Sequence, residues 1–240
     1  MISQKAMRSS LVLLILLTKI TIGYAATCNA QECDGYKIPL EIQGVIHNGY
    51  ENIAVINISG FKYLSVTTKN DVNKCSVLFK IDSQIVNSTP TVGVKEQICN
   101  ITTHDSNIIS SWRDSGKWND DVYQVNSDGM WKLLFRDSCV GCDQVKRTYF
   151  NSGKVSGTSL LADGNNFSDR KPLIGKVDVD KANLYKQPDI EMQLKAYLIK
   201  GDSITLIDMS DDGAFYKVKY SISSGKNIFY WIKSDDFSLQ

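Results

Sequence analysis

Six cysteines and two histidines are the residues of this chain best suited to covalent or metal chemistry. Cys139 and Cys142 form a CxxC motif, which elsewhere is redox active or supplies half of a zinc site. A redox motif opens a helix that follows a strand, whereas the polar residues around this motif indicate a turn between strands. No second CxxC is present to complete a zinc site. We therefore interpret the pair as a structural disulfide that closes a tight hairpin, and we predict no metal and no cofactor.

The even number of cysteines indicates a disulfide framework in an exported chain. Sequence alone does not determine the connectivity, because six cysteines allow many pairings. Proximity along the chain favours three local bonds, namely Cys28 with Cys33, Cys75 with Cys99, and Cys139 with Cys142. Such bonds form in oxidising compartments outside the cytoplasm.

The first 25 residues predict a signal peptide. A positively charged start precedes a wholly apolar run at residues 11–17, and small residues lead up to Ala25. The apolar run is far shorter than the roughly 20 residues needed to span a bilayer. We expect cleavage near Ala25 and a periplasmic or secreted protein with no stable membrane span. A lipid anchor at Cys28 is the alternative, although Thr27 stands where lipid attachment favours Gly or Ala.

The charge balance argues against nucleic acid as a partner. Residues 1–25 hold three basic residues and no acid, so the chain that follows has 24 Lys and Arg against 26 Asp and Glu. Nucleic-acid binding needs a basic stripe, because neutralised phosphates supply most of the affinity. The sequence shows no such stripe, and we expect no nucleic-acid ligand.

Strand signals dominate the chain as far as residue 172. Segments rich in β-branched and aromatic residues alternate with turn pairs such as Asn48-Gly49, Asp128-Gly129 and Ser152-Gly153. Residues 105–112 are the best candidate for one short helix. The fold class that we predict is all-β, with a disulfide-stapled β-rich domain of unknown family at residues 28–172. Its predicted strands are residues 42–46, 53–58, 63–66, 76–81, 122–125, 131–135 and 145–150.

A second domain follows a polar loop that ends at Pro172. It contains, in order, the motifs Ala182-Asn183-Leu184-Tyr185, Lys200-Gly201-Asp202, Phe215-Tyr216-Lys217-Val218 and Tyr230-Trp231-Ile232-Lys233. With these motifs, residues 175–240 resemble the bacterial SH3-like domains of exported proteins. The resemblance implies a small β-barrel that binds peptidoglycan or a partner protein.

The resemblance also permits a test for catalysis, because such a domain often accompanies a cell-wall hydrolase. Those hydrolases pair a cysteine nucleophile with a histidine further along the chain. Here His47 and His104 both precede Cys139 and Cys142, and neither an HExxH motif nor a glycine-rich nucleophile elbow occurs. The sequence therefore predicts that the protein is not an enzyme.

Carboxylates are the remaining residues that could do chemistry. Glu41, Asp120, Asp121 and Asp137 show no spacing that singles out a catalytic pair, and we interpret them as surface acids. Residues 163–169 offer several oxygen ligands but lack the twelve-residue loop, ending in glutamate, of the common calcium site. We expect a plain surface loop there.

Aromatic residues are the best candidates for binding. In the first domain, Trp112, Arg113 and Trp118 lie in a polar, glycine-containing segment, and residues of these types make interface hot spots. The alternative is that one tryptophan fills the core and the other covers it. In the second domain, four aromatic residues could line a shallow groove, although strand alternation must turn some of them inward: Tyr185, Tyr197, Tyr216 and Trp231.

Two functions remain after these exclusions. The first is a non-catalytic recognition protein, an immunity or inhibitor protein that binds an enzyme toxin delivered to the cell envelope. The second is a cell-wall-associated protein that binds peptidoglycan and targets or organises other factors. The sequence does not distinguish a protein ligand from a glycan.

Overall fold

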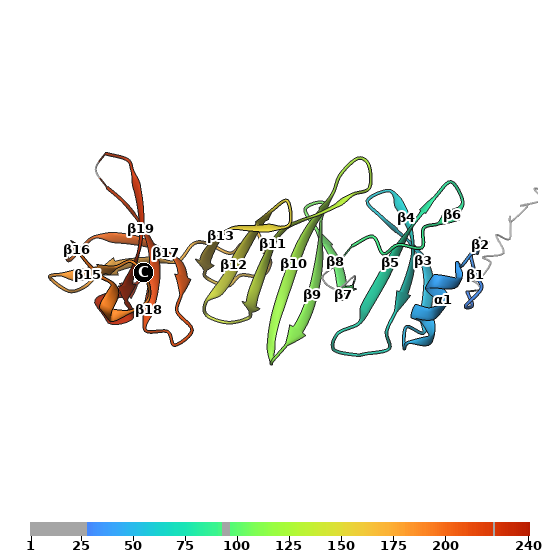
Figure 1. Cartoon of the computed structure of the whole chain (residues 1–240), viewed down its shortest axis with the longest axis horizontal. Helices are drawn as coiled ribbons and strands as arrows, with labels where there is room; N and C mark the ends of the chain where they lie inside the picture. Colours follow the sequence, from blue (N-terminus) through green and yellow to red (C-terminus); the bar gives the residue numbers. More distant parts are fainter. Residues whose placement is uncertain (1–27, 93–96, 223) are drawn as a thin grey trace, which may run out of the picture.

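The computed structural model describes residues 28–92, 97–222 and 224–240, so the predicted signal peptide lies outside the described residues. The described chain forms three β units that follow one another along the long axis of the molecule (Figure 1). Within the described residues the single α-helix has 8 residues, and no helix there is long and apolar enough to cross a membrane. The predicted all-β fold class is confirmed.

The first unit is an antiparallel sheet with a helix on one face (Figure 1). The order of its strands is β3-β4-β5-β6, and β7 pairs with β5. Its elements are β1 (Glu32–Cys33), β2 (Tyr36–Lys37), α1 (Leu40–His47), β3 (Asn52–Ile58), β4 (Phe61–Thr67), β5 (Cys75–Asp82), β6 (Ile85–Val86) and β7 (Ile98–Cys99).

Helix α1 shows that the strand predicted at residues 42–46 was wrong. Ile42 is completely buried, and Val45 and Ile46 pack against the same core three and four positions later. This spacing places the three side chains on one face of a helix. The element is too short for its period to stand out against its β-branched composition.

The second unit is an antiparallel sheet of six strands in chain order. Its strands are β8 (Ile101–His104), β9 (Asn107–Asp114), β10 (Lys117–Val125), β11 (Trp131–Val140), β12 (Val145–Asn151) and β13 (Lys154–Leu161).

The β8–β9 hairpin occupies the place of the short helix predicted at residues 105–112, which is therefore wrong. Asp105 and Ser106 form the turn with φ angles of 49° and 64°. Positive φ at two central residues is the conformation that favours a two-residue hairpin. Ile108 and Ser110 are then buried at alternate positions, as a strand requires.

The first two units share a hydrophobic core. Strands β4 and β5 are buried on both faces, so that Tyr63 and Leu78 point away from α1 and pack with Ile108 and Tyr123 of the second sheet. The Nε1–H of Trp131 donates a hydrogen bond to the hydroxyl oxygen of Tyr63 at 3.1 Å. The predicted domain at residues 28–172 therefore contains two sheets packed on each other.

The third unit is a seven-stranded antiparallel sheet with a core of its own. The strand order is β16-β15-β19-β18-β17-β14-β20. Its elements are β14 (Ile174–Val177), β15 (Ala182–Tyr185), η1 (Ile190–Met192), β16 (Gln193–Leu198), β17 (Ser203–Met209), β18 (Phe215–Ser221), β19 (Asn227–Lys233), η2 (Ser234–Asp236) and β20 (Phe237–Leu239), where η marks a 3-10 helix.

Side chains of the second unit pack into the third unit. Leu160 of β13 is 3% exposed and belongs to the core that contains Leu206 and Ile232. The Lys146 ammonium lies 2.6 Å from the Asp208 carboxylate, and it joins β12 to β17. These contacts hold the two units against each other.

Three disulfides join the residue pairs that proximity predicts. Cys75 and Cys99 lie opposite each other on β5 and β7, and Cys139 and Cys142 close the β11–β12 connection. Cys28 and Cys33 form the third bond near the β1–β2 hairpin. The interpretation of the CxxC motif as the disulfide of a tight hairpin is confirmed.

Candidate functional site

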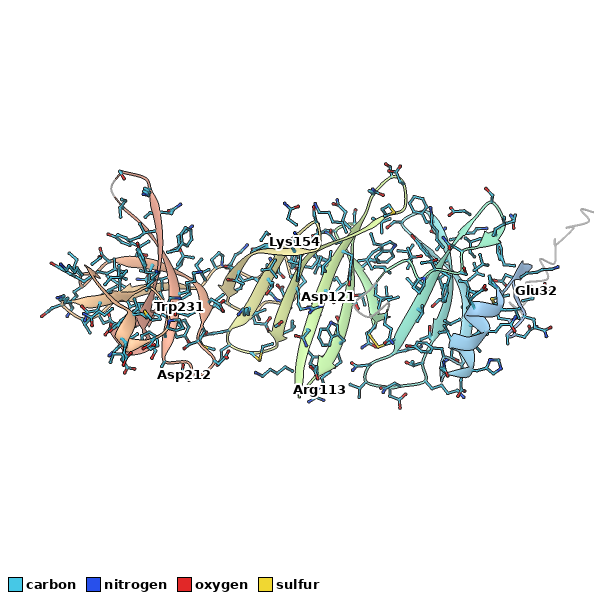
Figure 2. All side chains as sticks on the ribbon, in the orientation of Figure 1. Glu32, Arg113, Asp121, Lys154, Asp212 and Trp231 are labelled. Carbon is cyan, nitrogen blue, oxygen red and sulfur yellow. A yellow bond between two sulfur atoms is a disulfide. The ribbon has the colours of Figure 1, made fainter. Side chains whose placement is uncertain are left out.

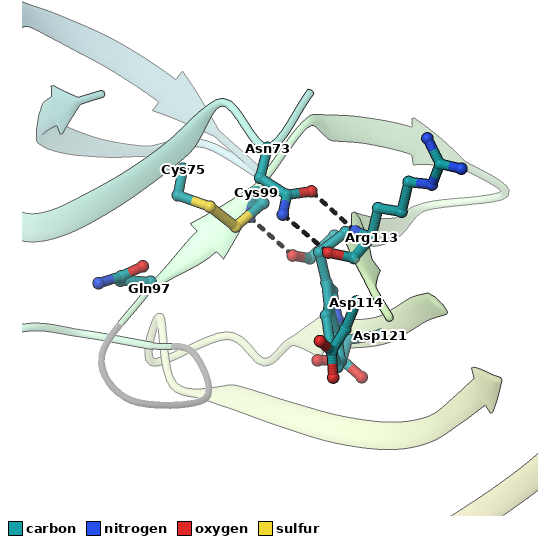
Figure 3. Close-up of a pocket in the computed structure, with 9 residues that line it drawn as sticks. Asn73, Cys75, Gln97, Cys99, Arg113, Asp114 and Asp121 are labelled. Carbon is teal, nitrogen blue, oxygen red and sulfur yellow. Dashed lines mark hydrogen bonds between the residues drawn. A yellow bond between two sulfur atoms is a disulfide. The ribbon is translucent and has the colours of Figure 1, made fainter. Parts of the chain in front are cut away.

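Trp112 lies between two adjoining pockets. The first, of about 390 Å³, is lined by the Cys75–Cys99 disulfide, Ser110, Trp112 and Asp121 (Figure 3). The second, of about 440 Å³, is lined by Trp112, Lys117, Lys146 and residues 208–211 of the third unit. Both pockets are lined by Trp112 and Asp114. We call the two pockets together the Trp112 groove.

The β9–β10 hairpin holds Trp112 in place. Trp112 pairs with Asn119, and Arg113 pairs with Trp118, across the two strands. Ser115 and Gly116 form the turn with φ angles of 49° and 82°, which suits a tight two-residue hairpin. The polar, glycine-containing segment that carries both tryptophans is therefore a regular hairpin, and the hydrogen bonds between its two strands order its backbone.

Arg113 fastens this hairpin to the first unit through its backbone. Its N–H donates to Oδ1 of Asn73 at 2.7 Å, and its carbonyl accepts from Nδ2 of Asn73 at 2.9 Å (Figure 3). The side chain turns back, and its Nε donates to the carbonyl of Gly116 at 3.3 Å. Arg113 thus contributes its backbone to the groove, and its guanidinium is bound to the β9–β10 turn instead.

The two tryptophans of this hairpin differ in position. Trp118 is 36% exposed and lines neither pocket, whereas Trp112 lines both. The structure therefore brings Trp112 together with Asp121 and Arg136, and it separates Trp118 from that group. Trp118 is a natural control for experiments on Trp112.

Arg136 and Asp121 support the Trp112 ring. The Arg136 guanidinium lies 5.1 Å from the ring centroid, within the range of a cation–π contact. Its Nε and Nη2 donate to the two Asp121 oxygens at 2.5 and 2.9 Å. Asp121 is only 2% exposed, so its interpretation as a surface acid was wrong. The two hydrogen bonds to Asp121 hold the Arg136 guanidinium in position, and the guanidinium in turn holds the Trp112 ring.

Two groups that interact with Asp121, namely Tyr123 and Arg136, hold their protons at neutral pH. Burial raises the pKa of Tyr123 well above its usual range, and the charge of Asp121 raises it further. The hydrogen bond to Asp121 raises the pKa of Arg136 above its already high value. Neither group can accept a proton near neutral pH. Arg136 therefore contributes a permanent positive charge, and Tyr123 contributes an uncharged ring.

The four aromatic residues predicted to line a groove in the third unit do not lie together. Tyr185 is 2% exposed and packs edge-to-face on Phe215, so its ring is covered and not available to a ligand. The Tyr216 ring points to the core side, and its hydroxyl hydrogen-bonds Gln144 of the second unit. Tyr197 is 51% exposed on β16 with the Lys181 ammonium 4.9 Å from its ring centroid. These four residues therefore do not form a single groove.

Trp231, which is labelled in Figure 2, lies on the side of β19 that faces away from the core of the third unit. It pairs with Lys217 on β18 and with Tyr185 on β15, and its side chain is partly buried. Its neighbours along β19, Tyr230 and Ile232, contribute to the core instead. Strand alternation therefore directs Trp231 away from that core.

A second charged cluster lies on the second sheet around Asp137, which is completely buried. Asp137 accepts hydrogen bonds from the guanidinium groups of Arg147 and Arg170. Arg170 also donates to Asp120 and to Asp163, each at 3.2 Å. Asp137 is therefore not the surface acid that we expected from the sequence. Residues 163–169 form a loop with no helix or strand, and Asp163 and Arg170 tie this loop to the sheet.

The nearest approach to a catalytic triad involves Ser168, His104 and Asp105. The Oγ of Ser168 lies 3.4 Å from Nε2 of His104, and a carboxylate oxygen of Asp105 lies 3.2 Å from that same nitrogen. A proton relay needs the acid and the hydroxyl on different ring nitrogens. In addition, Ser168 donates to the side-chain oxygen of Asn166 at 2.6 Å. This arrangement does not activate the serine.

A possible metal-binding cluster among the described residues comprises Cys28, Cys33 and Asp34. Both sulfurs form a disulfide bond and offer no thiolate. The cluster therefore supplies no thiolate ligand set while that bond is intact.

Comparison of the chain with protein-family models, curated proteins and solved structures gives no significant match. A function is therefore inferred from the Trp112 groove and from its chemistry.

Proposed function

We propose that the protein is a non-catalytic recognition protein of the periplasm or extracellular space that binds a partner protein through the Trp112 groove. In its sharpest form, it is an immunity or inhibitor protein that binds an enzyme toxin in the cell envelope. The observation that carries the proposal is the supported Trp112 ring at the centre of two adjoining pockets.

The lining of the groove supports a protein ligand. It includes acids, such as Asp114 and Asp211, and bases, such as Lys117 and Lys146. Protein interfaces combine a large aromatic or arginine anchor with surrounding polar residues of both charge signs. All three units contribute lining residues, so the groove is an extended, open surface and not a closed cavity for a small molecule.

Export supports the same proposal. The three disulfides need an oxidising compartment, and the predicted signal peptide would provide the route to it. We also propose that residues 175–240 are a bacterial SH3-like domain, a class that usually binds. The seven-stranded antiparallel sheet arranged around one hydrophobic core supports a small β-barrel there.

Replacing Trp112 by alanine should weaken binding of the partner by about 2 kcal/mol or more, because a supported aromatic anchor is lost. The protein without residues 1–25 is used to capture a partner from envelope extract. The partner is then identified, purified and titrated against wild type and Trp112→Ala by calorimetry.

Trp118→Ala is the matched control, since Trp118 lies on the same hairpin and outside both pockets. It should leave the affinity unchanged, and circular dichroism should show the same fold for both variants. Equal affinity of Trp112→Ala and wild type would exclude the groove as the binding site. Sedimentation with insoluble peptidoglycan tests the alternative ligand, and strong binding there with no protein partner would favour the cell-wall function.

The purified protein should show no turnover of peptidoglycan, phospholipid or disulfide substrates above buffer. The reason is that the polar groups beside Trp112 are locked in an ion pair, and both sulfurs of the CxxC motif are bonded to each other. Release of products is followed by chromatography, and disulfide reduction by absorbance. A rate that Cys139→Ser abolishes would contradict the structural role of this disulfide.

A further inference from the structure

The outer face of the β18–β19 hairpin carries alternating lysines and aromatic rings. Lys217 pairs directly with Trp231, and Lys219 pairs directly with Phe229. Directly paired residues of antiparallel strands lie on the same face, with their Cβ atoms about 5 Å apart. We call these four residues the lysine–aromatic face. In Figure 1 the hairpin that carries it extends beyond the rest of the third unit.

The orientation of this face follows from its neighbours. Val218 and Ile232 are almost completely buried in the core of the third unit, and Tyr230 packs against that core. Residues adjacent to these along each strand must point the opposite way. Phe229 is accordingly 50% exposed, and Lys217, Lys219 and Trp231 are partly exposed.

The positive charge of the face is not neutralised within the described chain. Neither Lys217 nor Lys219 forms a salt bridge with any described residue. The acid opposite Lys217 is Asp208, and its carboxylate is bound by the Lys146 ammonium at 2.6 Å. Asp235 and Asp236 lie at the far end of β19, where their neighbouring cation is Lys233. Two lysines and two rings therefore remain available to a ligand.

We propose that the lysine–aromatic face binds an extended segment of a partner protein in which acidic and apolar side chains alternate. Residues two apart on a strand are separated by about 6.6–6.8 Å, and an extended segment alongside would have the same repeat. Its carboxylates would contact Lys217 and Lys219, and its apolar side chains would cover Trp231 and Phe229. This surface adjoins the Trp112 groove at Asp208, which lines that groove and pairs directly with Lys217. The face is made of residues that do not line the groove, and the proposal does not depend on the function proposed above.

The test uses a fluorescein-labelled synthetic peptide of alternating Glu and Tyr, with a peptide of alternating Lys and Tyr as the ligand control. Fluorescence anisotropy with the full protein, without residues 1–25, should show salt-dependent binding of the acidic peptide only. The double variant Lys217→Glu with Lys219→Glu should bind the acidic peptide at least about tenfold more weakly, because each attraction becomes a repulsion.

The matched control is Lys195→Glu with Lys200→Glu, which changes the net charge equally at two exposed lysines outside the face. It should leave the affinity unchanged, and Phe229→Ser should weaken it without any change of charge. Should the charge-reversed variant melt early, Lys217→Gln with Lys219→Gln provides the same comparison with less perturbation.

Three results would overturn the proposal. The first is equal peptide affinity of the Lys217 and Lys219 variants and wild type. The second is an equal loss in the Lys195 and Lys200 control, which would show an effect of net charge alone. The third is binding of heparin with no binding of the acidic peptide, which would assign the face to a sulfated or other anionic polysaccharide.

Discussion

Replacing Asp137 by alanine should lower the free energy of unfolding by about 3–5 kcal/mol. Asp137 is completely buried and accepts hydrogen bonds from both Arg147 and Arg170, of which the Arg170 side chain is 2% exposed. Its removal leaves the mostly buried Arg147 guanidinium without a carboxylate partner, and Arg170 keeps only its longer contacts with Asp120 and Asp163. A buried charge that loses its partner is costly. Urea unfolding followed by tryptophan fluorescence measures the change.

Asp105→Ala is the control for this experiment. The Asp105 side chain is 68% exposed, and its ionic contact is with His104 at the surface. Its replacement should change stability by no more than about 0.5 kcal/mol. A loss of less than about 1 kcal/mol for Asp137→Ala would show that the buried cluster does not hold residues 163–170 against the sheet.

Removal of the Cys75–Cys99 disulfide, by Cys75→Ser with Cys99→Ser, should cost about 3 kcal/mol. The bond closes a loop with a sequence separation of 24, and its loss restores conformational freedom to the unfolded chain. Strand β7 is also held by a hydrogen bond that this change leaves in place, from the backbone N–H of Cys99 to Oγ of Ser110 at 2.8 Å. Thermal unfolding should show a markedly lower melting temperature.

The matched comparison is Cys139→Ser with Cys142→Ser. This bond has a sequence separation of only 3, so its removal should destabilise the protein less than removal of the longer loop. Labelling of free thiols in the native wild-type protein, or equal stability of the Cys75 and Cys99 variant and wild type, would contradict the disulfide framework.

Most of the strands of the first two units could be predicted from local patterns, because composition and turn residues agree there. Six of the seven predicted strands lie within β3, β4, β5, β10, β11 and β12, and the predicted turn glycines Gly49, Gly129 and Gly153 have positive φ. The two errors have a common cause. Residues 42–46 and 105–112 are short, and tertiary burial of Ile42 and Ile108 decided between helix and strand.

The site was only partly predictable. Aromatic and charged composition indicated Trp112, but not its partners Asp121 and Arg136, because acids within a strand are usually exposed. Counting outward from the β10–β11 turn places Asp120 opposite Arg136. The register shift between Val122 and Tyr123 moves Asp121 into that position instead. A bulge of this kind leaves no clear signal in composition, and it decides which carboxylate meets the guanidinium.

The contacts that join the second and third units have a consequence for affinity. Leu160 is inserted into the core of the third unit, and Gln144 and Lys146 bind Tyr216 and Asp208 across the junction. No flexible tether therefore separates the Trp112 groove from the lysine–aromatic face. A partner that reaches both surfaces meets the second at a high effective concentration as soon as it binds the first, and two weak contacts then act as one strong one.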